Sequence, residues 1–170
     1  KIAYANFEAV VAGAAAGTPD SLRIAETLTF TVTEVGKAAV STNVAVAANA
    51  ESSAVAASIN ANVTGVVATA STAVRIGNVN SSANDTVALT INGQSLGVIA
   101  TGANDTAFGA TVATAIAGNA ALSGLTVTTD ANGITLRDNS GADITVAAGA
   151  FVDGDADAAA HKVTVEGVDA

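Results

Sequence analysis

The sequence contains no cysteine, methionine or tryptophan, and it has one proline, one tyrosine and four phenylalanines in 170 residues. The absence of cysteine excludes disulfide bonds, thiolate metal sites and cysteine nucleophiles. Because methionine is absent, we expect the chain to be a segment of a longer protein. Aromatic residues make up 3% of the chain, so the core must consist mainly of Ala, Val, Ile and Leu, which bury modest apolar area per residue.

Positive charge is also scarce, with six Lys and Arg against 15 Asp and Glu and a net charge of −9. An acidic surface repels phosphates, so neither nucleic acid nor an anionic membrane surface is an expected partner. No apolar run approaches the roughly 18 residues of a membrane-spanning helix. The Ala-rich opening segment carries Glu8 in its middle and a single basic residue, which favours a mature chain over a signal peptide.

The apolar residues that are present mostly alternate with threonine, a period-two pattern that predicts half-buried strands. Threonine suits the exposed face of such strands because it is both β-branched and polar. Asn92-Gly93 and Asn132-Gly133 are signals for two-residue hairpins, and Ser140-Gly141 predicts a further turn. The predicted strands are residues 28–33, 64–67, 73–76, 87–92, 125–129, 134–137, 144–146 and 163–166.

Two Ala-rich segments, residues 48–59 and 105–116, break this pattern and predict short helices. In the second segment, the larger residues fall on one helical face, and Asn104 or Asp105 can cap the start. In the first segment, Val55 and Ile59 share a face with Ser52. The apolar face of the second segment, residues 105–116, is formed by Phe108, Val112, Ala115 and Ile116.

The predicted elements repeat at a spacing of about 60 residues, which indicates two copies of one module. The fold class is therefore α+β, mainly antiparallel β with two short helices, in two repeated β-β-α-β-β modules. We expect the first module at residues 26–82 and the second at residues 83–148. Residues 1–25 form a stem strand and entry segment, and residues 149–170 a return strand that pairs with it. In that hypothesis residues 2–10 and 163–168 lie side by side.

The second module resembles the flagellin and hook-associated repeat that is named for its Ile-Asn pair. Ile91-Asn92-Gly93 matches the first turn of that repeat, and residues 141–146 (GADITV) match its last strand. At the end of the helix, Ala117 stands where the repeat has Asn, whereas the first module keeps the pair as Ile59-Asn60. The match covers residues 85–147 well and residues 26–77 weakly.

This resemblance implies the surface-exposed outer domain of a bacterial flagellin, a structural protein of the motility filament. It implies an extracellular location on the flagellum, no cofactor, and self-assembly with identical subunits through regions outside this chain. Host immune receptors or antibodies are further partners of such a domain. The alternatives are a filament cap or hook–filament junction protein and, from another class, an extracellular adhesin module. An enzyme is not expected, because the sequence offers no catalytic residues.

Candidate sites are few. Asp153, Asp155 and Asp157 alternate like the start of a calcium loop, but Ala158 and Thr164 occupy the positions that need Gly and Glu, which favours a solvated acidic turn. His161, the single histidine, lacks the partners of a catalytic triad or a zinc site.

Glycosylation is the other candidate chemistry. Residues 80–86 form the most loop-like stretch, in which Ser81, Ser82 and Thr86 are candidate positions for O-linked sugars. The alternative interpretation of this stretch is a plain linker between the modules.

Overall fold

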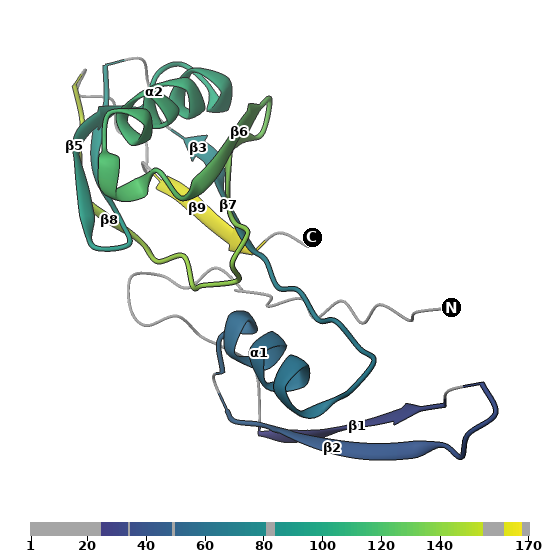
Figure 1. The fold of residues 1–170 in the computed structure, drawn as a ribbon. Helices are drawn as coiled ribbons and strands as arrows, with labels where there is room; N and C mark the ends of the chain where they lie inside the picture. Colours follow the sequence, from purple (N-terminus) through teal and green to yellow (C-terminus); the bar gives the residue numbers. More distant parts are fainter. Residues whose placement is uncertain (1–24, 34, 49, 81–83, 155–161, 168–170) are drawn as a thin grey trace.

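The computed structural model describes residues 25–33, 35–48, 50–80, 84–154 and 162–167 (Figure 1). This part of the chain is an α+β fold in which every strand pairing is antiparallel. The helices are α1 (Ser52–Asn62), α2 (Asp105–Ala117) and the short 3₁₀ turn η1 (Ala120–Leu122). The strands are β1 (Glu26–Val32), β2 (Val40–Val46), β3 (Thr72–Asn80), β4 (Thr86–Ile91), β5 (Gln94–Ala100), β6 (Leu125–Asp130), β7 (Gly133–Asp138), β8 (Val146–Val152) and β9 (Lys162–Gly167).

The strands form three sheets, in the orders β1-β2, β6-β7-β3-β9 and β5-β4-β8. We call β1, β2, α1 and residues 63–70 the ribbon unit, and β3 to β9 with α2 and η1 the sheet unit. Figure 1 shows α1 lying across the two-stranded ribbon, and α2 lying with the other two sheets. Each unit has its own cluster of buried apolar residues.

The core of the ribbon unit forms between one face of the ribbon and one face of α1. Val55 and Ile59 point from the helix, as predicted, and meet Val44 and Val46 of β2. The opposite face of the ribbon is exposed and polar, with a hydrogen bond of 2.9 Å from Thr29 Oγ1 to an Asn43 side-chain oxygen. Thus the period-two pattern of threonine in β1 sorts the polar side chains to the solvent face.

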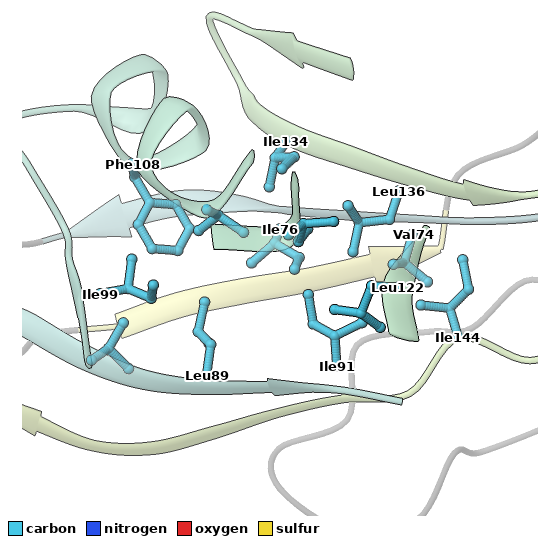
Figure 2. Close-up of a cluster of buried hydrophobic side chains, with 13 residues drawn as sticks. Val74, Ile76, Leu89, Ile91, Ile99, Phe108, Leu122, Ile134, Leu136 and Ile144 are labelled. Atoms are coloured by element: carbon cyan, nitrogen blue, oxygen red, sulfur yellow. The ribbon is translucent and has the colours of Figure 1, made fainter. Parts of the chain in front are cut away.

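The core of the sheet unit lies between its two sheets and α2. Phe108 points from α2 into this cluster and is fully buried (Figure 2). Figure 2 also shows Leu89 and Ile91 of the three-stranded sheet facing Ile76 and Leu136 of the four-stranded sheet. The aliphatic composition is therefore sufficient for a core because two sheets and a helix share it.

Helix α2 follows the sequence prediction closely. The Asn104 side chain accepts a hydrogen bond of 2.9 Å from Ala107 N, which makes Asn104 the N-cap. Phe108, Val112 and Ile116 are buried on the predicted face. Gly109 allows close approach to β7, because an added Cβ would lie 2.8 Å from the Gly133 carbonyl oxygen.

Two of the predicted hairpins differ in their turn chemistry. Asn92 and Gly93 have φ angles of 49° and 74°, as a type I′ turn between β4 and β5 requires. The β6–β7 hairpin instead turns at Ala131–Asn132, and Gly133 already pairs with Asp130. Here the Asp130 carboxylate accepts a hydrogen bond of 2.7 Å from Asn132 N, and this Asx turn replaces the type I′ geometry.

The predicted turn at Ser140-Gly141 is present. Asp138 Oδ1 accepts a hydrogen bond of 2.7 Å from Ser140 N, and Gly141 has a φ of 78°. This turn leads the chain from β7 toward the irregular segment that precedes β8.

Three element predictions are wrong, and two strands are missing from the predicted set. Helix α1 begins at Ser52 instead of residue 48. Residues 64–67 form no strand, because the chain turns at Thr64 and Gly65, where Gly65 has a φ of 82°. The strand expected at residues 144–146 begins where that prediction ends, as β8. The predicted ranges contain neither β2 nor β5, although the hairpin predicted at Asn92-Gly93 requires a strand in the place of β5.

The repeat order is complete in one copy only. Strands β4 and β5, helix α2 and strands β6 and β7 follow the predicted β-β-α-β-β order. After α1, by contrast, the chain continues into β3, which pairs with β7 and β9 in the sheet unit. The expected second half of the first module is therefore absent from the ribbon unit, and the domain boundaries themselves stay predictions.

The predicted stem also stays a prediction, because residues 2–10 lie outside the described part of the chain. Strand β9 pairs with β3 and stands at the edge of its sheet among the described strands. Across the described residues, no helix is both long and apolar enough to span a membrane.

Candidate functional surfaces

The acidic calcium candidate is only partly visible. Asp153 follows β8 directly and is exposed, whereas Asp155 and Asp157, like His161, lie outside the described residues. Within the part of the chain that the structure describes, no three acidic, histidine or cysteine side chains gather in a metal-binding group. The calcium hypothesis thus gains no support from the described geometry.

Of the three glycosylation candidates, only Thr86 is among the described residues. Ser81 and Ser82 lie outside the described residues. Thr86 is the first residue of β4, is half-buried, and pairs with Ala100 on one side and Val152 on the other. Its position in the central strand of a sheet contrasts with the loop that the sequence suggested.

A buried carboxylate next to Thr86 connects the ends of three strands. Asp85 is fully buried, and its Oδ1 accepts a hydrogen bond of 3.0 Å from Gly154 N, just beyond β8. Its carbonyl oxygen accepts bonds from Thr101 N and Thr101 Oγ1, just beyond β5, at 3.0 and 3.1 Å. Asp85 therefore has a structural role that its loop-like sequence context did not reveal.

Asn60 has an equally specific role at the end of α1. Its Nδ2 donates a hydrogen bond of 2.8 Å to the carbonyl oxygen of Ala68, and its Oδ1 accepts one of 2.7 Å from Ala68 N. The side-chain amide thus pairs with the backbone as a neighbouring strand would. Ile59 beside it is buried to 1% exposure in the ribbon core. In this pair, one residue anchors the helix and the other holds the segment that follows.

In the sheet unit, the chain that follows the helix is held by different contacts. Ala117 ends α2 and cannot make the amide contacts of Asn60. Two residues later, the Asn119 side chain accepts a hydrogen bond of 3.1 Å from Ala121 N and caps η1. The 3₁₀ turn then places Leu122 in the core, at 2% exposure, before β6 begins. The chain therefore replaces an amide tether with a capped turn.

A shallow hollow of about 400 Å³ lies between the C-terminal half of α2, η1 and β6. Ile116, Leu122, Leu125 and Val127 supply most of its apolar lining, and Asn119, Ser123 and Thr129 supply the polar atoms. None of the lining residues is ionisable. The hollow therefore offers neither an acid–base pair nor a nucleophile with its base.

The two units contact each other at the start of α1. Glu51 is the N-cap residue but makes no side-chain cap bond, and the Gly141 carbonyl oxygen accepts a hydrogen bond of 3.1 Å from Ser53 N. A Cβ on Gly141 would lie 2.4 Å from the Ala70 side chain and 3.0 Å from Ser53 N. A carbonyl of the sheet unit thus caps the helix of the ribbon unit.

Unfavourable polar groups accompany this junction. The hydroxyls of Ser52 and Thr72 are buried without a hydrogen-bond partner. Partial burial, and then the nearby charge of Glu51, raise the pKa of Asp143 above its ordinary value. A buried hydroxyl without a hydrogen-bond partner costs free energy, so these groups destabilise the folded chain.

Comparison with known proteins identifies no relative of this chain. No protein-family model, curated protein or solved structure matches the chain. The functional argument therefore depends on the order of its elements and on the contacts described above.

Proposed function

We propose that this chain is the surface-exposed structural domain of a bacterial flagellar filament subunit, which acts by packing and display outside the cell. The observation that carries the proposal is the order of elements in residues 86–138. Strand β4, the Asn92-Gly93 turn, β5, α2 and the β6–β7 hairpin follow one another as the resemblance to the flagellin and hook-associated repeat implies.

The Ile-Asn pair gives further support. Ile59 fills the ribbon core and Asn60 binds the backbone of Ala68, so each residue of the pair has a distinct structural use. These structural roles give a physical reason for the Ile-Asn pair by which the repeat is recognised.

The surface properties suit a domain displayed at high density. A net charge of −9 keeps neighbouring copies in solution by repulsion. On the exposed ribbon face, Thr29 bonds with Asn43 and Thr31 with Ser41 across the two strands. In this proposal the domain packs on the filament and forms its outer surface, and no residue of the chain is assigned a catalytic role.

The test is to identify the parent protein and its location. An antibody raised against this chain is used for immunogold electron microscopy of intact cells and of sheared filaments, and peptide mapping gives the sequence on both sides of residues 1–170. Labelling along the filament, with long helical heptad-bearing flanks, supports the flagellin proposal.

Other outcomes separate the alternatives. Gold particles only at the filament tip or at the hook junction indicate a cap or junction protein instead. Labelling of the cell wall, with flanking sandwich repeats, indicates an adhesin and overturns the proposal.

A further inference from the structure

The outer face of the three-stranded sheet β5-β4-β8 carries no charge. The inner face packs Val87, Leu89 and Ile91 into the core, so the alternate residues of β4 point outward. Their paired neighbours on β5 and β8 share that face. From one end to the other, the rows of this outer sheet face are Val152–Thr86–Ala100, Ala88–Val98, and Ala147–Thr90–Ser95.

This outer sheet face is uncharged, and its valines are exposed. Val98 and Val152 retain 71% and 61% of their accessible surface. None of the residues in β4, β5 or β8 is ionisable, although the whole chain carries 15 acidic residues. Asp85, at the end of β4, is turned into its hydrogen-bond network with Gly154. The strands themselves are uncharged, and Asp85 and Asp153 lie just beyond them at the end where Thr86 pairs with Val152.

We propose that the outer sheet face packs against the same face of a second copy of this chain. A net charge of −9 makes approach between copies costly wherever carboxylates meet, and this face allows approach without burying any charge on its strands. Its side chains are Ala, Val, Thr and Ser, which are small enough for two sheets to pack closely, at about 10 Å. A two-fold axis near Ala88, which is central in the central strand, makes the contact self-complementary.

The chemistry of the face disfavours other occupants. It carries no aromatic side chain to stack on a sugar, and no Trp, Tyr or Arg to anchor a different protein. A sugar on Thr86 would stand on this face, so modification there and packing of two copies exclude each other.

The size of the face sets the strength of the contact. Three strands of about six residues cover roughly 20 × 15 Å, or about 300 Å² per copy. Two copies then bury on the order of 600 Å², about half of what a stable specific interface needs. The contact is therefore weak between free domains and becomes populated at the millimolar local concentrations of a shared support. This last step rests on the proposed function, in which a filament supplies that support.

Because the chain has no cysteine, single cysteines test the contact cleanly. Ala88→Cys is compared with Ala45→Cys, a matched control on the exposed polar face of β2. Two cysteines that face each other across sheets about 10 Å apart are too distant for a disulfide, so both 170-residue variants are treated at about 1 mM with a short bis-maleimide cross-linker. The cross-linked dimer is followed by denaturing gel. We expect A88C to dimerise at least about tenfold faster than A45C, and V98D in the A88C background to lower its rate to that of A45C.

Circular dichroism and the melting temperature verify that each variant is folded, and Val98→Lys replaces V98D if V98D is not. Equal rates for A88C and A45C, or a fast A88C rate that survives a charge at position 98, overturn the inference. Its failure is separable from that of the proposed function. Slow A88C dimerisation together with filament labelling would reject the contact between sheet faces and leave the flagellin proposal in place. Fast A88C dimerisation together with cell-wall labelling would reject the flagellin proposal and leave the contact in place.

Discussion

The ribbon unit and the sheet unit each contain two paired strands followed by a helix, but they bury cores of very different size. Five residues form the buried cluster of the ribbon unit, whereas thirteen form that of the sheet unit. A two-stranded ribbon is marginal in water unless another element covers it, and among the described residues α1 and the segment after it, residues 63–68, cover this one. We infer that most of the stability of the chain resides in the sheet unit, and that the ribbon unit opens at lower free energy.

The cause of this difference is the path of the chain after each helix. After α2, the chain returns immediately as the β6–β7 hairpin and closes its own core. After α1, residues 63–71 run without regular structure into β3, which pairs with β7 and β9. Thus Val74 and Ile76, which follow the first helix in sequence, stabilise the other unit. The comparison teaches that a sequence repeat need not be a repeat of packing.

The largest expected effect is on the core of the sheet unit. Phe108→Ala removes a fully buried ring from the centre of that core, and we expect a loss of about 3–5 kcal/mol in the free energy of unfolding. Guanidinium unfolding followed by circular dichroism measures the loss. Phe30→Ala, a half-buried phenylalanine of the ribbon unit, is the matched control. An equal or larger loss for F30A would contradict the ranking of the two cores.

The next effect should be confined to the ribbon unit. Ile59→Ala leaves a cavity in a cluster of five buried residues and costs about 2–5 kcal/mol locally. We expect hydrogen exchange by mass spectrometry to show lost protection in α1, β1 and β2, with unchanged protection in β4 and β7. Ile59→Val, at about 0.5–1.5 kcal/mol, gives the graded control. Equal loss in both units would show instead that they unfold as one.

The pattern of apolar residues was sufficient to predict the fold class because most elements are amphipathic. Both helices and the hairpin at Asn92-Gly93 are local features, in which periodicity and a positive φ carry the information. Strand β8 is different, since Ala147, Ala148 and Gly149 have low strand propensity and the two alanines are held by pairing with β4. Tertiary contacts decided its position, and no local signal could have placed it.

The polar anchors were hidden for a related reason. Asp85 lies in a Ser- and Asn-rich stretch that resembles a linker, and its partners Thr101 and Gly154 are distant in sequence. Asn60 was identified as part of a pair, but its contact with Ala68 depends on the turn after α1. Side chains that bind backbone across such separations give no periodic signal. Their roles follow only from coordinates.

Asn60→Ala should sharpen the comparison with the sheet unit, where Ala117 already ends the helix. The change removes two hydrogen bonds to Ala68, and we expect it to cost about 1–2 kcal/mol within the ribbon unit. Hydrogen exchange of residues 63–70 measures it. Asn62→Ala is the control, because it removes a single bond to Ser58 and gains helix propensity, for a change near zero. Similar effects of the two variants would remove the tether role of Asn60.

The smallest effect should appear where the two units meet. The pKa of Asp143 is raised, so the folded state holds the proton more tightly than the unfolded chain and the ionised carboxylate weakens folding. Asp143→Asn should therefore be slightly more stable than the parent chain at pH 7. The advantage should shrink as the pH falls through the raised pKa, and vanish below the unfolded value of about 3.9, where both chains are neutral at this position.

Urea midpoints of both chains from pH 7 to pH 3.5 test this order of stability. Glu51→Gln separates the two causes, because it removes the like charge but not the partial burial, which is the larger cause. In the E51Q background the advantage of D143N should decrease without disappearing. A D143N chain less stable than its parent at pH 7 would mean that ionised Asp143 supports the junction.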